Sequence, residues 1–282
     1  MAVAVTHFAD RLVDLVERRQ TQLVVGLDPV PDRMPDAARG DIGAFCEGII
    51  DAVADHAVAV KPQSAFFEAQ GPDGVRAFFE VCAYARDAGL LVIADVKRGD
   101  IGSTATAYAA AYAQAADAVT VNPYLGRDSL QPFVDVCRTR GTGMFCLVKT
   151  SNPGSVDVQD VQLADGTVLW QHVARLVAEV GEGLVGERGL SSVGAVVGAT
   201  FPAEVAAARR LLPRAPFLLP GIGAQGGAPG DVASAFAVGP AGGLVSASRS
   251  VIYASAGADW REAAGDAAKM LAREAWHVAS AA

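Results

Sequence analysis

The stretch LLVIADVKRGD, residues 90–100, joins a short apolar run to a cluster of charged residues. An unbroken apolar run of this length is typical of a parallel β-strand that is buried on both faces. Charged residues that directly follow such a strand lie where barrel enzymes place their chemistry. The sequence therefore predicts a buried strand over 90–97 that ends in functional side chains.

Seven further runs of this kind occur along the chain. Together the predicted strands are 22–29, 57–63, 90–97, 118–123, 144–150, 193–200, 217–221 and 243–248. Segments with helical periodicity lie between them, such as 45–56, 75–88, 104–116 and 202–212. Eight strands that alternate with helices predict a (β/α)8 barrel, with a doubly wound sheet as the alternative.

No linker or charge block divides the chain, so we expect a single domain over residues 1–282. Its first helix is predicted over 7–20 and its last over 258–279. The stretch 151–166 is the longest irregular connection, and long connections in compact domains are often lids or binding loops.

Composition excludes several classes of protein. With 51% hydrophobic and 19% charged residues, the chain is too apolar to be disordered. A net charge of −8 argues against nucleic acid and anionic membranes as partners. No apolar run is long enough for a membrane span, and the first residues lack a signal peptide. Four cysteines without a CxxC pair and four scattered histidines predict free thiols, no metal site and a cytoplasmic location.

The charged cluster after the third strand is the strongest candidate site. Asp95 and Lys97 are two positions apart, so they point to the same face of a regular strand. Asp100 follows in the loop, and Lys61 ends the preceding strand. On spacing alone, a structural ion pair is the simpler interpretation of Asp95 and Lys97. Lys61 and the position at the strand ends favour an active site instead.

A glycine-rich stretch, PGIGAQGG at 220–227, follows the seventh strand. It contains the GxGxxG pattern, but it comes late in the chain and no acidic residue follows at the ribose-binding distance. Glycine amides here and Arg249 after the eighth strand instead predict a phosphate site, because barrels often bind phosphate with these two loops. A tight turn beside an exposed arginine is the alternative.

Two further strand ends carry polar candidates. Ser151, in the TSNPG stretch at 150–154, is placed to hydrogen-bond a planar amide, although turn formation explains the same residues. Asp28 is placed to accept from sugar hydroxyls, or to cap the next turn.

Taken together, these motifs resemble the orotidine 5'-monophosphate decarboxylase family, and most of all its longer bacterial branch. The resemblance runs from about residue 23 to 253 and rests on the stretches GLDP (26–29), KPQ (61–63), DVKRGDI (95–101), TSNPG (150–154), PGIGAQGG (220–227) and RS (249–250). It implies decarboxylation of orotidylate to uridylate, the last step of new pyrimidine synthesis, with no metal or cofactor.

The resemblance also implies roles for individual residues. Lys97 matches the proton donor to C6, Asp95 faces the departing carboxyl group, and Lys61 and Asp100 complete a charged tetrad. Asp100, Ile101 and Thr104 match residues that reach the partner's site in a homodimer. The implied substrate-binding residues are Asp28 for the ribose, Ser151 for the pyrimidine, and Gly223, Gln225, Gly226 and Arg249 for the phosphate.

Departures from the shorter branch of the family include Ser248 before the arginine and Asn122 at the fourth strand end. Two rival functions also remain at this point. One is a magnesium-dependent decarboxylase or aldolase of keto-sugar phosphates, and the other is a noncatalytic barrel that binds a phosphate ligand.

Overall fold

Eight parallel strands close into a barrel in the computed structural model, which describes residues 6–222 and 227–282. Each strand pairs with its neighbours in sequence, and β8 pairs with β1. The strands are β1 (Leu23–Leu27), β2 (Ala59–Pro62), β3 (Leu91–Arg98), β4 (Ala118–Val121), β5 (Gly143–Lys149), β6 (Val193–Val197), β7 (Phe217–Pro220) and β8 (Gly243–Ala247). Every one overlaps a predicted strand, so the (β/α)8 prediction is confirmed and the doubly wound sheet is wrong.

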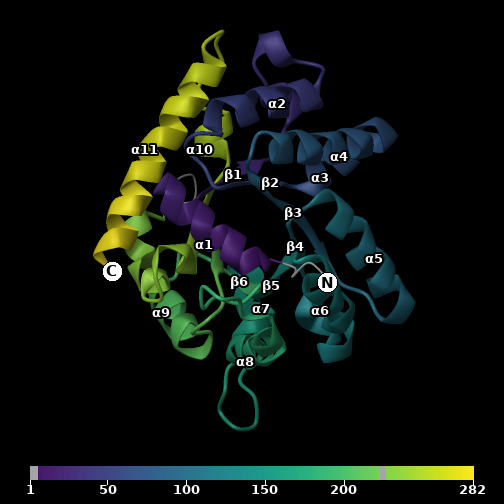
Figure 1. Ribbon diagram of the computed structural model, residues 1–282, viewed down its shortest axis with the longest axis vertical. Helices are drawn as coiled ribbons and strands as arrows, with labels where there is room; N and C mark the ends of the chain where they lie inside the picture. The colour runs from purple at the N-terminus through teal and green to yellow at the C-terminus, as the bar shows by residue number, and fades with distance from the viewer. Residues whose placement is uncertain (1–5, 223–226) are drawn as a thin grey trace.

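Helices connect the strands and surround the barrel (Figure 1). They are α2 (Ile42–Val53), α3 (Ser64–Glu68), α4 (Gly71–Asp87), α5 (Gly102–Ala115), α6 (Arg127–Arg140), α7 (Val156–Gln159), α8 (Leu169–Gly181), α9 (Pro202–Leu211) and α10 (Arg249–Ile252). A 3₁₀ segment, η6 (Pro229–Phe236), lies between β7 and β8. The last helix, α11 (Trp260–Ala281), packs against α2 and β1.

Most strand residues are apolar because both faces of the strands are buried. Val24 and Ile93 belong to the cluster inside the barrel, together with Phe145. Their neighbours Val25 and Val92 belong instead to the larger cluster between the strands and the helices. Alternate side chains therefore enter two different cores, which explains why the strands are mostly apolar.

The first helix, α1 (Phe8–Arg19), closes one end of the barrel. It crosses in front of the strands in Figure 1. Phe8 meets the ring of Phe145 edge to face at 6.0 Å, and a Cβ on Gly143, the first residue of β5, would lie only 2.3 Å from the Phe8 ring. Arg11 pairs with Asp117 just before β4. Since α1 covers the amino ends of the strands, the opposite end, where the strands finish, forms the mouth.

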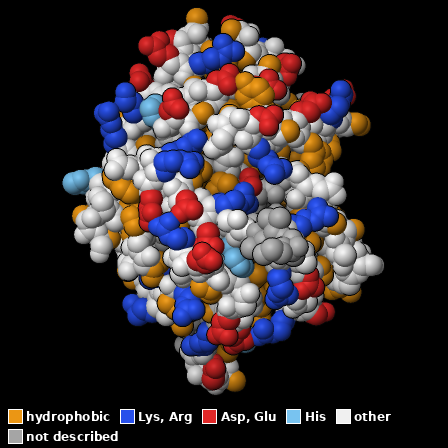
Figure 2. Space-filling model, in the orientation of Figure 1, with side chains coloured by type: hydrophobic (Ala, Val, Ile, Leu, Met, Phe, Trp, Pro, Cys, Tyr) orange, Lys and Arg blue, Asp and Glu red, His pale blue; other side chains and the backbone are white. Residues whose placement is uncertain are grey.

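The surface around α1 carries mixed charge. Figure 2 shows acidic and basic side chains interspersed over this face, without a large area of one sign. None of the helices within residues 6–222 and 227–282 has the length and hydrophobicity that a membrane span requires.

The connection after β5 is more regular than the sequence predicts. It holds a 3₁₀ turn at Pro153–Ser155, the short helix α7, and an antiparallel bridge between Gln162 and Val168. The expected irregular loop at 151–166 is therefore a folded segment beside the mouth.

Candidate active site

Lys61, Asp95 and Lys97 meet at the mouth of the barrel. Lys61 Nζ lies 2.6 Å from Asp95 Oδ2, and Lys97 Nζ lies 2.6 Å from Asp95 Oδ1. The side chains of Lys61 and Asp95 are 10% and 7% exposed, whereas that of Lys97 is 44% exposed. One carboxylate thus bridges a buried ammonium and an ammonium that opens toward solvent.

Two neutral side chains complete the shell around Asp95. Gln63 Nε2 donates to Oδ2 at 3.1 Å, and Thr120 Oγ1 donates to Oδ1 at 3.0 Å. Each carboxylate oxygen therefore accepts two hydrogen bonds, which uses the four lone-pair positions of the group. We did not expect either residue from the sequence, although Thr120 is a polar residue inside an apolar strand and Gln63 directly follows a strand that ends in lysine.

This arrangement fixes the charge of the buried pair. Burial by itself would raise the pKa of Asp95, but Lys61 and Lys97 outweigh it and hold that pKa well below its usual range. Burial would likewise lower the pKa of Lys61, but the carboxylates of Asp95 and Asp28 raise it. Both groups are therefore ionised at neutral pH.

The backbone at Lys97 departs from a regular strand. Lys97 has φ of 45°, in the left-handed region that side chains other than glycine rarely adopt. The pairing of β3 with β4 shifts register between Ala94 and Arg98. The predicted contact between Asp95 and Lys97 is present, but strict strand alternation is the wrong reason for it, because the chain bulges between them.

Asp100, Ile101 and Thr104 lie on the open side of the mouth. Asp100 Oδ1 accepts from the Ile101 amide at 2.8 Å, and no ion pair joins Asp100 to Lys61 or Lys97 within the described residues. The Ile101 side chain is 58% exposed, and Thr104, in the first turn of α5, is exposed too. Of the four charged residues of the expected tetrad, the single chain thus brings three together.

Asp28 and Arg249 lie at the ends of neighbouring strands β1 and β8. Asp28 Oδ1 is buried and has no hydrogen-bond partner among the described residues. The Asp28 carbonyl accepts from the Tyr253 hydroxyl at 2.9 Å, and that hydroxyl accepts from the Val30 amide at 2.6 Å. Arg249 is the first residue of α10 and is exposed.

Ser151 lies beside the end of the neighbouring strand β6. It is the second residue after β5, and a Cβ on Gly198, which directly follows β6, would lie 3.0 Å from the Ser151 backbone nitrogen. Nearby, the buried Lys149 pairs with Asp160 at 2.6 Å. Gln159 Oε1 accepts from the Thr150 amide at 2.9 Å. These contacts tie the connection after β5 to its own strand.

Three of the expected phosphate ligands, Gly223, Gln225 and Gly226, lie outside the described residues. On either side of them, Gly221 has φ of 108°, and the Gly227 amide donates to the Gly221 carbonyl at 3.1 Å.

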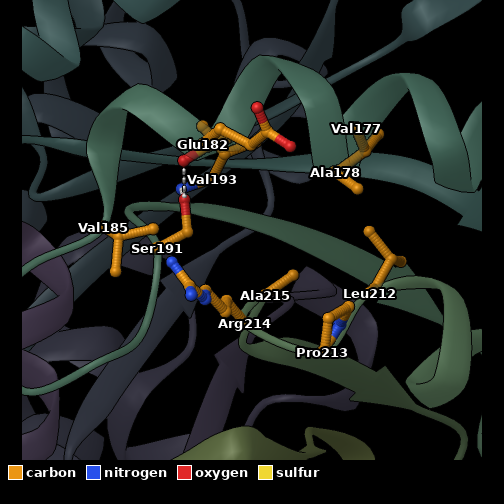
Figure 3. A pocket seen from close by; sticks show the side chains of 11 residues that line it. Val177, Ala178, Glu182, Val185, Ser191, Val193, Leu212, Pro213, Arg214 and Ala215 are labelled. Carbon is orange, nitrogen blue, oxygen red and sulfur yellow. Dashed lines mark hydrogen bonds between the residues drawn. The ribbon is translucent and has the colours of Figure 1, made fainter.

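One cavity lies away from the mouth. It has a volume of about 420 Å³ and is lined by side chains of α8 and of the segment between α9 and β7 (Figure 3). Val185 and Ser191, before β6, and Leu212 and Arg214, before β7, place it near the amino ends of the strands. None of the candidate site residues lines it, so this cavity is separate from the convergent charges at the mouth. In the part of the chain that the structure describes, no three His, Cys, Asp or Glu side chains are grouped to hold a metal ion.

Comparison with known proteins agrees with this geometry. Residues 21–264 match the model of the orotidine 5'-phosphate decarboxylase / HUMPS family. The chain is 45% identical to an orotidine 5'-phosphate decarboxylase of Rhodopirellula baltica over 88% of each chain. It is 46% identical to that of Halorubrum lacusprofundi over 94% of this chain and 96% of the relative. A crystal structure of an orotidine 5'-phosphate decarboxylase from Streptomyces avermitilis superposes with a TM-score of 0.87 at 37% identity, over 99% of this chain and 98% of that one. The chain therefore belongs to the orotidine 5'-phosphate decarboxylase family, as its motifs predicted.

Proposed function

We propose that this barrel converts orotidine 5'-monophosphate to uridine 5'-monophosphate and carbon dioxide, in pyrimidine biosynthesis, with Lys97 as charge stabiliser and proton donor. The observation that carries the proposal is the chain of contacts from Lys61 through Asp95 to Lys97 at the mouth. Family membership supports the reaction. The geometry supports different roles for the two lysines, with Lys97 at the reacting carbon and Lys61 as the buried partner of Asp95.

Loss of carbon dioxide breaks the bond between C6 and the carboxyl carbon and leaves the electron pair on C6. A fixed ammonium beside C6 stabilises that charge as it develops and then transfers a proton to it. Lys97 suits this role because its side chain is 44% exposed at the mouth, whereas that of Lys61 is 10% exposed and is buried against Asp95. Lys97 then regains a proton from solvent.

Asp95 contributes to the reaction through its negative charge. Its charge keeps the Lys97 ammonium fixed at 2.6 Å, so little reorganisation is needed as charge appears on C6. Beside a substrate carboxylate, Asp95 also repels the ground state, and the repulsion fades as carbon dioxide departs. We rank this second effect below the electrostatics of Lys97.

The coordination of Asp95 supports a mechanism without a metal. Lys61, Gln63, Lys97 and Thr120 occupy its four acceptor positions. A cation would have to displace one of these donors to reach the carboxylate.

Substrate binding is proposed to surround this centre. Asp28 accepts from ribose hydroxyls, consistent with its buried oxygen, which has no partner in the part of the chain that the structure describes. Ser151 hydrogen-bonds the pyrimidine. The phosphate is held by Gly223, Gln225, Gly226 and Arg249. Binding energy from the remote phosphate then orients the ring over Lys97.

We further propose that two copies of the chain share their sites. Asp100, Ile101 and Thr104 are available on the open side of the mouth, and the nearby strand end β4 is followed by Tyr124 and Leu125, which are 81% and 46% exposed. Exposed apolar side chains beside an active site are typical of an interface. Four free, buried cysteines are consistent with the reducing cytoplasm.

The test is turnover of orotidylate by the purified protein, followed by ultraviolet absorbance, with and without EDTA. We expect equal rates in both. Turnover that EDTA abolishes would contradict the metal-free mechanism, and activity on a keto-sugar phosphate with added magnesium instead would favour the rival decarboxylase or aldolase. Tight uridylate binding without turnover would favour a binding protein.

A further inference from the structure

Thr120, in β4, contacts two of the three charged residues of the site, Asp95 and Lys97, through one hydroxyl group. The residue is fully buried. Its Oγ1 lies 3.0 Å from Asp95 Oδ1, 3.0 Å from the amide nitrogen of Val96 and 2.9 Å from that of Lys97. All three partners belong to the stretch of β3 that carries the proposed chemistry.

These three contacts fix the direction of each hydrogen bond. A hydroxyl has one proton to donate and two lone pairs that accept. The amides of Val96 and Lys97 are donors, so they occupy the two lone pairs. The hydroxyl proton is therefore directed at Asp95 Oδ1, and all the hydrogen-bonding capacity of Thr120 is used.

The same hydroxyl holds the bulge that presents Lys97. The amides of Val96 and Lys97 lie in the irregular part of the pairing between β3 and β4. Lys97 has a positive φ there, which costs free energy unless surrounding contacts enforce it. By accepting from both amides, Thr120 stabilises the backbone conformation that turns the Lys97 side chain toward Asp95 and the mouth.

We propose that Thr120 is a positioning residue for the decarboxylation: it fixes Asp95 by donating to it and fixes Lys97 by accepting from its backbone. This inference rests on the proposed role of Lys97. Since Thr120 is buried behind Asp95, it acts through these two residues and does not contact the nucleotide.

The test compares Thr120→Val, which keeps the shape but removes the hydroxyl, with Thr120→Ser, which keeps the hydroxyl. Thr142→Val is the matched control, because Thr142 is also buried but precedes β5 at the closed end of the barrel. For each protein, kcat and KM for orotidylate, Kd for uridylate and the melting temperature are measured.

We expect Thr120→Val to lower kcat about 100-fold, the loss expected when a reacting group is misplaced by about 1 Å. KM for orotidylate and Kd for uridylate should stay within about threefold of the wild type, and Thr120→Ser should restore kcat to within about fivefold. Thr142→Val should leave kcat unchanged, whatever its effect on melting. If Thr120→Val does not fold, Thr120→Ala takes its place, because the smaller side chain fits the same space, and a loss in kcat of at least about 10-fold is expected.

Equal kcat in Thr120→Val and the wild type would overturn the inference, and so would a loss that Thr120→Ser fails to rescue. A rise in KM with unchanged kcat would show that the residue affects binding instead. An inactive wild type would contradict the proposed function itself, and the two failures are thereby distinguished.

Discussion

Replacement of Lys61 by Met tests the energetic basis of the site. The variant keeps the length and apolar stem of the side chain but removes the ammonium that lies 2.6 Å from Asp95. Asp95 then stays buried with a single cationic partner, Lys97, whose side chain is much more exposed than that of Lys61. The expected result is a large loss of stability together with loss of turnover.

The magnitude follows from burial. Removing one partner of a buried ion pair costs about 3–5 kcal/mol, because the remaining charge is left desolvated. Lys97, Gln63 and Thr120 still contact Asp95, so the lower end of that range, about 3 kcal/mol, is expected. For a domain of this size, such a loss lowers the melting temperature by roughly 6–12 °C.

The dependence of this effect on pH has a definite sign. The folded-state pKa of Asp95 is depressed, so its contribution to stability is complete above the unfolded value of about 3.9 and is lost as pH falls through the folded value. The folded-state pKa of Lys61 is raised, so its contribution is complete below about 10.4 and is lost as pH rises through the folded value. The difference between wild type and variant should therefore be largest from about pH 5 to 9.

The assay is urea unfolding at several pH values, in a double-mutant cycle with Asp95→Asn. Removing both partners should cost less than the sum of the single variants by at least about 1 kcal/mol. Lys269→Met, on the exposed face of α11, serves as the control and should change stability by no more than about 0.5 kcal/mol. A loss below about 1 kcal/mol for Lys61→Met, or strict additivity in the cycle, would refute the argument.

Three other perturbations test the rest of the site. Arg249→Ala should raise KM for orotidylate at least about 10-fold, because it removes a charged phosphate contact, and unchanged kinetics would take Arg249 out of the phosphate site. Mixing the inactive variants Lys97→Ala and Asp100→Ala should restore part of the activity through hybrid dimers, and no recovery in confirmed hybrids would count against shared sites. Lys149→Met should speed proteolysis within 150–160, because it removes the ion pair with Asp160. It should cost less stability than Lys61→Met, because the partner carboxylate is 39% exposed. Equal proteolysis of variant and wild type would contradict this prediction.

The sequence predicts the barrel well because the core inside the barrel and the core between strands and helices both require apolar residues in the strands. Strands that are buried on both faces require unbroken apolar runs, and the polar residues that end those runs mark the mouth. The sequence predicts that Lys61, Asp95 and Lys97 lie close together, because the carboxyl ends of neighbouring parallel strands meet at the mouth of a barrel.

The finer geometry has no comparable local signal. The bulge at Lys97 depends on a hydroxyl from the next strand, so neither β3 nor β4 alone predicts it. Thr120 is a single polar residue in an apolar strand, and the strand sequence does not indicate which three groups it contacts. The separation of Asp100 from the lysines likewise depends on the conformation of a loop, which the spacing of the motif does not determine.

Turnover by Lys97→Ala tests the central claim most directly. The variant should fold, because Lys61, Gln63 and Thr120 still donate to Asp95. It should bind uridylate with a Kd close to that of the wild type, since Lys97 is assigned to the reacting carbon. Its kcat for orotidylate should fall by about 10⁴-fold or more, because both charge stabilisation and the proton donor are lost. Lys269→Ala, the matched control on α11, should retain full activity. A Lys97→Ala enzyme that keeps kcat within about 10-fold of the wild type would contradict the role of Lys97 and the mechanism built on it.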